Sequence, residues 1–358
     1  MAPLIIKHLS PSAIREYMTN RQSFFLKYVR LVFEQKTGPS LHEGTAFHRA
    51  LELYWKDRKK KSAELIGESD WAYYLDQGLA TLAAACAQDK IDWGKEGCIG
   101  DSEDVVRNLV QNYRTDIPEL TSEEVEFSIT TKFDHPGIGE DRMLKVKLDL
   151  LASDTSRGPH PRDHKSVKEL SSDELELRPP QYDIQAGATY FALKSFYGKA
   201  PEKMVFDEVL KGTPNPAKGL KKPDLIALCE ENGIEVDKKA TCEILIEVLL
   251  ARDILKRPPV TKHYEIKFVN EDGEFDQCIP LFLEIYSRIV NELSGGGPFD
   301  PKTNTFKFIP NPFQSFGGED AWKDFKEEVL TDRKWTAEEV EMARKMAYGG
   351  GSVVQLDD

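Results

Sequence analysis

The plainest hydrophobic pattern in the chain is the alternation over residues 143–150. Leu144, Val146 and Leu148 alternate there with polar residues, and a period of two is typical of a β-strand with one buried face. Residues 124–133 alternate in the same way and are joined to this stretch by a loop that contains Pro-Gly. The two stretches therefore predict a β-hairpin. Further strands are predicted at 162–166, 203–211 and 263–270.

Helical patterns surround these strands. Ser10 followed by Pro11 is a typical helix start. In a second predicted helix, Phe47, Leu51 and Tyr54 recur at the spacing of a buried helix face. The other predicted helices span 72–87, 102–113, 182–193, 277–293 and 336–347.

The composition changes after a Pro-Asn-Pro turn at 214–216. Residues 220–252 predict a helix, a turn at Gly233 and a second helix that begins at Thr241. This stretch resembles a SAP-like helix-extended-helix module, which implies binding of DNA or of a protein partner, such as a recombination or replication protein. Its basic residues are matched by acidic ones, so a plain helical hairpin is the alternative.

Length, charge and cysteine usage narrow the class of protein. A chain of 358 residues holds one large domain or two. The net charge of −13 argues against a protein that coats nucleic acid nonspecifically, but it leaves room for a local basic channel. No apolar run reaches the roughly 20 residues that span a bilayer, so we expect a soluble, cytoplasmic protein without membrane contact. Free, buried thiols are expected at the five scattered cysteines, Cys86, Cys98, Cys229, Cys242 and Cys278.

The candidate chemistry lies on two of the predicted strands. Asp149 falls on the polar face of 143–150. In 162–166 the same period places Asp163 and Lys165 on one face and His164 on the other. Two carboxylates that converge from neighbouring strands suit a hard divalent cation such as magnesium. A lysine beside them can place the attacking water and offset charge on a phosphate, so the pattern predicts phosphodiester hydrolysis.

The order Asp149, then Asp163-x-Lys165, resembles the PD-(D/E)XK nuclease superfamily. The residues on either side of this pattern resemble the RecB-type, phage-like exonuclease branch. Gly44 and His48 match a Gly-x-x-x-His helix of that branch, in which the histidine binds metal. A downstream helix of the branch bears glutamine and tyrosine. The resemblance covers 9–198 and implies an α/β fold with a restriction-endonuclease-like mixed central sheet flanked by helices, to which this chain adds the small helical insert.

The resemblance also implies the site residues. Glu126 has a counterpart in many relatives, but we leave it out of the ligand set because a glutamate on a strand can be a plain surface charge. The cofactor is expected to be Mg²⁺ or Mn²⁺. The catalytic set is Asp149, Asp163, Lys165, Gln185 and Tyr190, and the metal set is His48, Asp149, Asp163 and His164.

The function expected from this resemblance is a metal-dependent deoxyribonuclease. It would act as an exonuclease on single-stranded or duplex DNA ends in recombination, repair or phage DNA processing. The alternatives are a catalytically weak DNA-binding recombination-accessory protein and a site-specific endonuclease. The expected domains are a first part of the nuclease core (1–214), the helical insert (215–255), a second part of the core (256–335), and a helix with a disordered acidic tail (336–358).

No iron–sulfur cluster is expected, although many relatives hold one with an early cysteine and three late ones. Asn20 stands at the early position and residues 316–319 at the late ones, and neither offers the thiolates that such a cluster needs. Protein purified without oxygen should be colourless and should contain no stoichiometric iron. A brown preparation with thiolate-to-iron absorbance would contradict this prediction.

Overall fold

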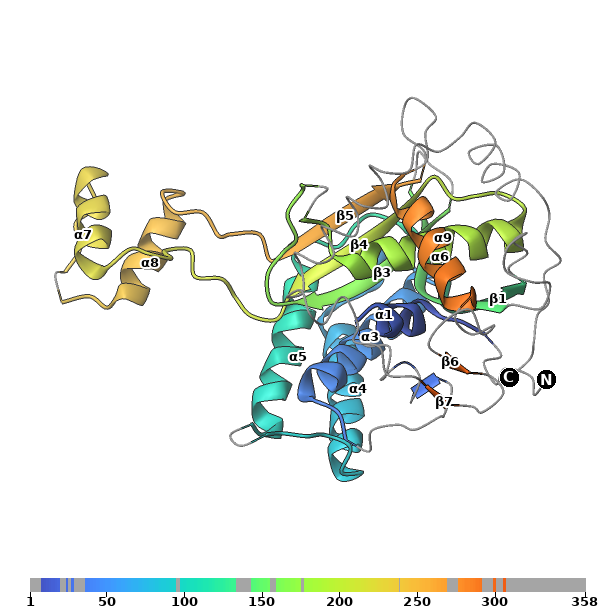
Figure 1. Cartoon of the computed structure of the whole chain (residues 1–358). Helices are drawn as coiled ribbons and strands as arrows, with labels where there is room; N and C mark the ends of the chain where they lie inside the picture. The colour runs from blue at the N-terminus through green and yellow to red at the C-terminus, as the bar shows by residue number, and fades with distance from the viewer. Residues whose placement is uncertain are drawn as a thin grey trace.

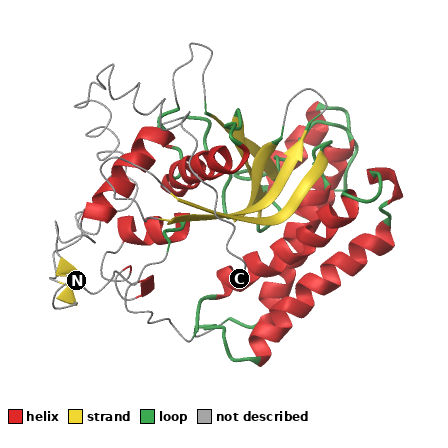
Figure 2. Cartoon of the chain, turned by 90° about the vertical axis from the view of Figure 1, so that its right-hand side faces the viewer, coloured by secondary structure: helices red, strands yellow, loops and turns green. Residues whose placement is uncertain are grey.

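The computed structural model is organised around a five-stranded mixed sheet, with helices on both faces (Figures 1 and 2). The strands follow the order β1-β2-β3-β4-β5. Their bounds are β1 Thr121–Lys132, β2 Met143–Ser153, β3 His160–Val167, β4 Lys203–Leu210 and β5 Thr261–Lys267. The structure describes residues 8–19, 24, 27–28, 36–94, 97–132, 143–154, 159–174, 177–237, 239–268, 276–291, 299–300 and 305–306.

The strand pairings confirm the predicted mixed α/β fold. β1 and β2 form the predicted antiparallel hairpin, β2 and β3 are antiparallel, β3 and β4 are parallel, and β4 and β5 are antiparallel. A parallel pair needs a crossover connection, and helix α6 (Pro180–Tyr197) supplies it between β3 and β4. This arrangement is consistent with a restriction-endonuclease-like fold. A separate two-stranded sheet joins β6 (Phe299–Asp300) to β7 (Thr305–Phe306).

One face of the sheet is covered by α1 (Pro11–Thr19), α6 and α9 (Cys278–Asn291). The predicted start of α1 is confirmed, because Ser10 Oγ accepts a hydrogen bond from the Ala13 amide at 3.2 Å. Leu144, Val146 and Leu148 are buried in this core, as their alternation predicts. The face therefore fixes α6, which carries Gln185, against β2.

The other face is covered by three helices, α3, α4 and α5. The predicted stripe of Phe47, Leu51 and Tyr54 is fully buried in their core, so α3 lies against the sheet with His48 beside its apolar stripe. The bounds of this layer are α3 Pro39–Arg58, α4 Glu68–Ala87 and α5 Ile99–Arg114, with a short 3₁₀ turn η2 at Ala63–Leu65.

Strands β2 and β3 pair over only three positions. The pairs run from Ala152 with His160 to Leu150 with Arg162. Continuing that register by one position would place Asp149 opposite Asp163, but the ladder between the described residues of these strands ends there. The two aspartates therefore lie where the strands stop pairing, and we call this position the fork.

The predicted helical insert forms α7 (Lys222–Glu231) and α8 (Cys242–Ala251), between β4 and β5. It projects away from the sheet (Figure 1) and has a small core of its own, in which Leu225, Leu245 and Leu249 are buried. The predicted helix start is confirmed, because Thr241 Oγ1 accepts from the Ile244 amide at 3.4 Å.

Some sequence predictions are corrected or lie outside the described residues. Cys98 and Cys242 are exposed and Cys86 is half-buried, so the prediction of buried thiols is wrong for these three. Cys98 and Cys242 both lie at the start of a helix, outside its buried face. The helix predicted at 336–347, the acidic tail and most of 292–335 lie outside the described residues. In the described part of the chain, no helix is long and apolar enough to cross a membrane.

Helix α6 lies close against α9 at Gly187. A Cβ atom there would lie 2.4 Å from the Cβ atom of Phe282, so we predict that Gly187→Ala destabilises the fold by about 1–3 kcal/mol through overpacking. Glycine-to-alanine changes inside helices otherwise stabilise, by up to about 1 kcal/mol. Gly100→Ala in α5, where the nearest atom lies at 3.7 Å, is the matched control. Denaturant unfolding that finds both variants equally stable would contradict this packing.

Candidate active site

Asp149 is the central carboxylate of the fork. Its Oδ1 lies 3.3 Å from Nδ1 of His48, which reaches it from α3, and its Oδ2 accepts a hydrogen bond from the His164 amide at 2.8 Å. The histidine of the predicted Gly-x-x-x-His helix thus meets the first predicted aspartate. His48 comes from α3 on one face of the sheet, and Asp149 lies where the pairing of β2 with β3 ends.

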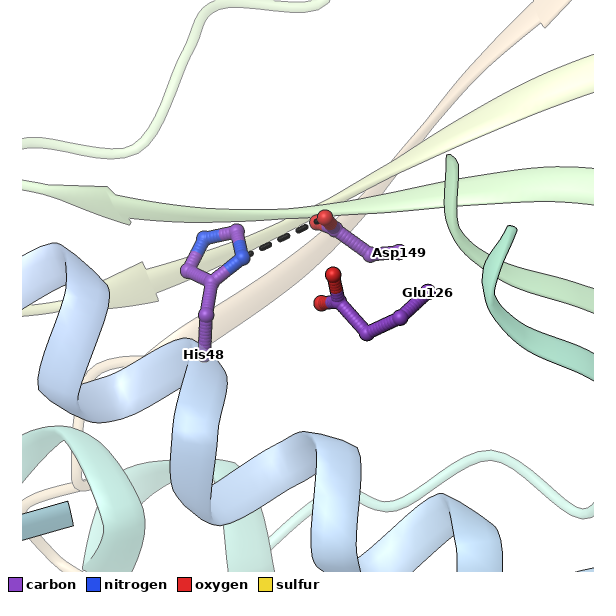
Figure 3. A group of neighbouring side chains, drawn as sticks. All are labelled: His48, Glu126 and Asp149. Carbon is purple, nitrogen blue, oxygen red and sulfur yellow. Dashed lines mark ion pairs between the residues drawn. The ribbon is translucent and has the colours of Figure 1, made fainter. Parts of the chain in front are cut away.

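Glu126 completes a group of three possible metal ligands with His48 and Asp149. One ligand atom from each residue lies within 4.8 Å of the others, and their side chains point toward a common centre (Figure 3). The pairs Val125 with Leu150 and Phe127 with Leu148 place Glu126 opposite Asp149 in the hairpin. A carboxylate from each strand of the hairpin and one imidazole therefore converge.

The backbone at Glu126 is strained. Its φ angle is +54°, a left-handed conformation that costs a non-glycine residue about 1–2 kcal/mol. Among the described strand residues, Glu126 is the one non-glycine residue with positive φ. Such strain persists where the surrounding structure requires it, and it collects at functional sites.

The second carboxylate and the lysine are linked by Gln185 of α6. Gln185 Nε2 donates to Asp163 Oδ1 at 2.5 Å, and Gln185 Oε1 accepts from Lys165 Nζ at 2.9 Å. Lys165 also forms an ion pair with Asp163. The amide thus holds an acid and a base of β3 side by side, and the structure brings these three predicted residues together.

The two aspartates at the fork have pKa values that are shifted in opposite directions. Burial alone would raise the pKa of Asp149, but the charge of His48 and the nearby His164 side chain hold that pKa well below its usual range. The pKa of Asp163 is raised, because burial outweighs the attraction of Lys165. Burial would lower the pKa of His48, yet Asp149 raises it to about 8. Asp149 is therefore ionised at neutral pH, ready to bind a cation.

His164 lies behind the fork rather than in the group of three. Its buried ring lies with Nδ1 3.7 Å from Asp149 and Nε2 3.7 Å from Asp207 of β4. Asp207 is itself held by Arg162 and by His263, whose Nδ1 lies 2.7 Å from it. Together these side chains form a polar support under Asp149, in which Arg162, His164 and Asp207 are buried, and such outer partners orient metal ligands.

Tyr190 is not brought to the fork. Its side chain is 1% exposed, and its ring packs against Phe268 at 5.0 Å in the core between α6 and the sheet. Tyr190 is five residues after Gln185, and five residues turn a helix by about 500°, which places the two on different faces. The remaining predicted residues, His48, Asp149, Asp163, Lys165 and Gln185, lie at the fork.

The donor set fits a divalent cation that prefers oxygen ligands. Two carboxylates and one imidazole converge from three elements, and Asp163 stands across the fork from them. Oxygen donors suit Mg²⁺ and Mn²⁺, and an imidazole favours the softer Mn²⁺. His48, Glu126 and Asp149 would hold the ion, with Asp163 beside it.

Glu126 is not in the metal set expected from the sequence. A signal for it was present, because the alternation in 124–133 could have been aligned with that in 143–150. The register of a hairpin follows from its loop, and here the loop is long, so the position opposite Asp149 was not fixed by the sequence.

Metal affinity should depend on the charge of His48, because a metal binds neutral imidazole. We predict that the affinity for Mn²⁺ rises about tenfold per pH unit from pH 6 toward 8 and then levels off, with one proton released per ion. Without metal, protonated His48 stabilises the fold below its unfolded pKa, and that contribution, at most about 2 kcal/mol, is lost as pH rises through 8.

Calorimetric titration in buffers of different ionisation enthalpy measures both the affinity and the released proton. His48→Gln is the control, and its Mn²⁺ affinity should be weaker and nearly independent of pH over this range. An equally flat affinity in the parent protein would contradict the assignment of His48 as a ligand.

Comparison with known proteins agrees with this geometry. A search of curated proteins finds no match to the chain. Among protein families, the PD-(D/E)XK nuclease superfamily matches residues 8–294, a range that includes every residue at the fork. The RecB-type branch and the SAP-like insert stay predictions. The family match covers most of the chain, and its characteristic Asp and Asp-x-Lys residues meet at the fork, so this protein belongs to the PD-(D/E)XK nuclease superfamily.

Proposed function

We propose that the protein is a Mg²⁺- or Mn²⁺-dependent DNA exonuclease. The observation that carries the proposal is the meeting of His48, Asp149, Asp163, Lys165 and Gln185 at one fork. Membership of the superfamily implies metal-dependent nuclease activity. The exonuclease assignment rests on the resemblance of Gly44-x-x-x-His48 and of the glutamine helix to the RecB-type branch. Recombination, repair and phage DNA processing are the processes in which such an enzyme acts.

Each side chain at the fork has a separate role in phosphodiester hydrolysis. A bound divalent ion would supply Lewis-acid polarisation of the scissile phosphate and of a water. Lys165, held by Asp163 and Gln185, orients the attacking water and offsets the negative charge that develops on the phosphate. His48 and Asp149 fix the position of this chemistry, and the support formed by His164 and Asp207 keeps Asp149 oriented.

Gln185 is a positioning residue in this mechanism. Its amide contacts both Asp163 and Lys165, so it holds the acid and the base in place while they also pair directly with each other. The stack of Tyr182 on Phe206, with ring centroids 4.0 Å apart, fixes the same helix on β4. Lys165 Nζ lies 5.9 Å from the centre of the Phe206 ring, so the lysine is held from two sides.

Loss of Lys165 or Asp149 should abolish cleavage without unfolding the protein. We predict that Lys165→Met and Asp149→Asn each lower the cleavage rate at least about a hundredfold, because each removes charge that acts in the transition state. Lys60→Met, at an exposed lysine just beyond α3, is the matched control and should cleave at the parental rate. Parental rates in the Lys165 variant, or activity that survives EDTA, would reject this mechanism.

Labelled substrates distinguish an exonuclease from an endonuclease. The same variants are assayed on end-labelled linear DNA and on circular DNA, single-stranded and duplex, with magnesium or manganese. An exonuclease releases label progressively from linear DNA and leaves circles intact. Cleavage of circles would replace the exonuclease assignment by an endonuclease, and DNA binding without cleavage would support the accessory-protein alternative.

A further inference from the structure

A cavity of about 370 Å³ opens beside the fork. Asp163, Lys165 and Gln185 form one of its walls, so it is continuous with the active site. The opposite wall comes from the first turn of α1 and from β2. Four cationic side chains line the cavity, namely Arg15, Lys145, Lys147 and Lys165. In a chain with a net charge of −13, this is a local concentration of positive charge.

The wall from α1 is fixed to β2 by backbone hydrogen bonds. The Leu9 amide donates to the Met143 carbonyl and the Lys145 amide donates to the Leu9 carbonyl, each at 2.9 Å. Helix α1 begins immediately after this bridge, at Pro11. These backbone hydrogen bonds therefore fix the start of the helix beside Lys145, and the cavity between them is formed by the fold itself.

The positive charge in the cavity is compensated at the end near the fork. Lys147 pairs with Glu126, and Lys165 pairs with Asp163. Arg15 is exposed, and no ion pair joins it to another of the described residues. The helix start adds little, because Pro11 has no N–H and the Ala13 amide is bonded to Ser10. Binding of an anion there would thus depend on the side chains of Arg15 and Lys145.

The spacing of residues along β2 separates the Lys145 end of the cavity from the three possible metal ligands, His48, Glu126 and Asp149. Lys145, Lys147 and Asp149 share the polar face of the strand, and each step of two residues advances about 6.5–7 Å. The backbone of Lys145 is therefore roughly 13 Å along the strand from that of Asp149. This spacing leaves room for one phosphate at the fork and a different phosphate beside Arg15 and Lys145.

We propose that the α1 side of this cavity binds a second phosphate of the nucleic-acid strand, held by Arg15 and Lys145 while the scissile phosphate lies at the fork. The proposal rests on the proposed nuclease function. Two anchored phosphates fix the direction in which a strand crosses the site. The phosphate is either an internal diester or the monoester at a strand end, and both present the same anionic oxygens to the two cations.

The test measures binding, so that it does not depend on cleavage. Kd for a fluorescent single-stranded oligonucleotide is determined in EDTA at several salt concentrations for the parent, Arg15→Gln, Lys145→Gln and the double variant. Each lost phosphate contact should lower the slope of log Kd against log salt by about 0.7. We expect about fivefold to tenfold weaker binding for each single variant at low salt. Lys60→Gln is the charge-matched control and should bind as the parent does.

Further variants separate a phosphate contact from a structural role. Lys145→Arg keeps the charge and should keep the salt slope, and thermal unfolding should be alike in all variants. Oligonucleotides with and without terminal phosphates, and a single-stranded circle, identify the source of the phosphate. A variant effect confined to phosphorylated ends supports a terminal monoester, and an equal effect on circles supports an internal diester.

An unchanged Kd and salt slope in the double variant would overturn the proposal. So would a loss of affinity that Lys145→Arg fails to restore. Neither result would touch the nuclease function, which is tested by cleavage through Asp149 and Lys165. A protein that binds DNA through the cavity but never cleaves it would instead reject the nuclease function and retain the phosphate site.

Discussion

The rest of the site depends on the point at which β2 and β3 stop pairing. Asp149 and Asp163 stand on opposite sides of that fork, and two buried carboxylates in such proximity repel each other unless cations compensate them. His48 and Lys165 supply this compensation from opposite sides, with Gln185 as a neutral link. A divalent ion at the same place would add the charge that the carboxylates still lack. Both helical layers contribute to the fork, because α3 carries His48 and α6 carries Gln185.

The sequence predicted the elements well where a strict period placed apolar residues on one face. The alternation around Asp149 and the stripe on α3 are both buried as expected. Local patterns could not show where a ladder ends, and the fork is a property of two strands together. Tyr190 is a different case, because its five-residue separation from Gln185 already places the two on different faces of one helix.

Glu126 shows what three-dimensional pairing adds to a sequence pattern. On its own strand it is one of several polar residues, and a strand-surface charge was a reasonable interpretation. Opposite Asp149 across the hairpin, and with a left-handed backbone, it becomes a candidate metal ligand beside His48 and Asp149. The support under the fork was equally hidden, since Asp207 and His263 come from strands that no short motif connects to Asp149.

The proposed mechanism requires that His48, Glu126 and Asp149 hold a divalent ion at the fork. Anomalous diffraction from crystals soaked in manganese tests it most directly. We expect a peak bonded to a nitrogen of His48 and to carboxylate oxygens of Glu126 and Asp149, at about 2.1–2.3 Å, and loss of that peak in the Asp149→Asn variant. A manganese ion bound away from these three residues, with the fork empty, would show that they are not the metal ligands.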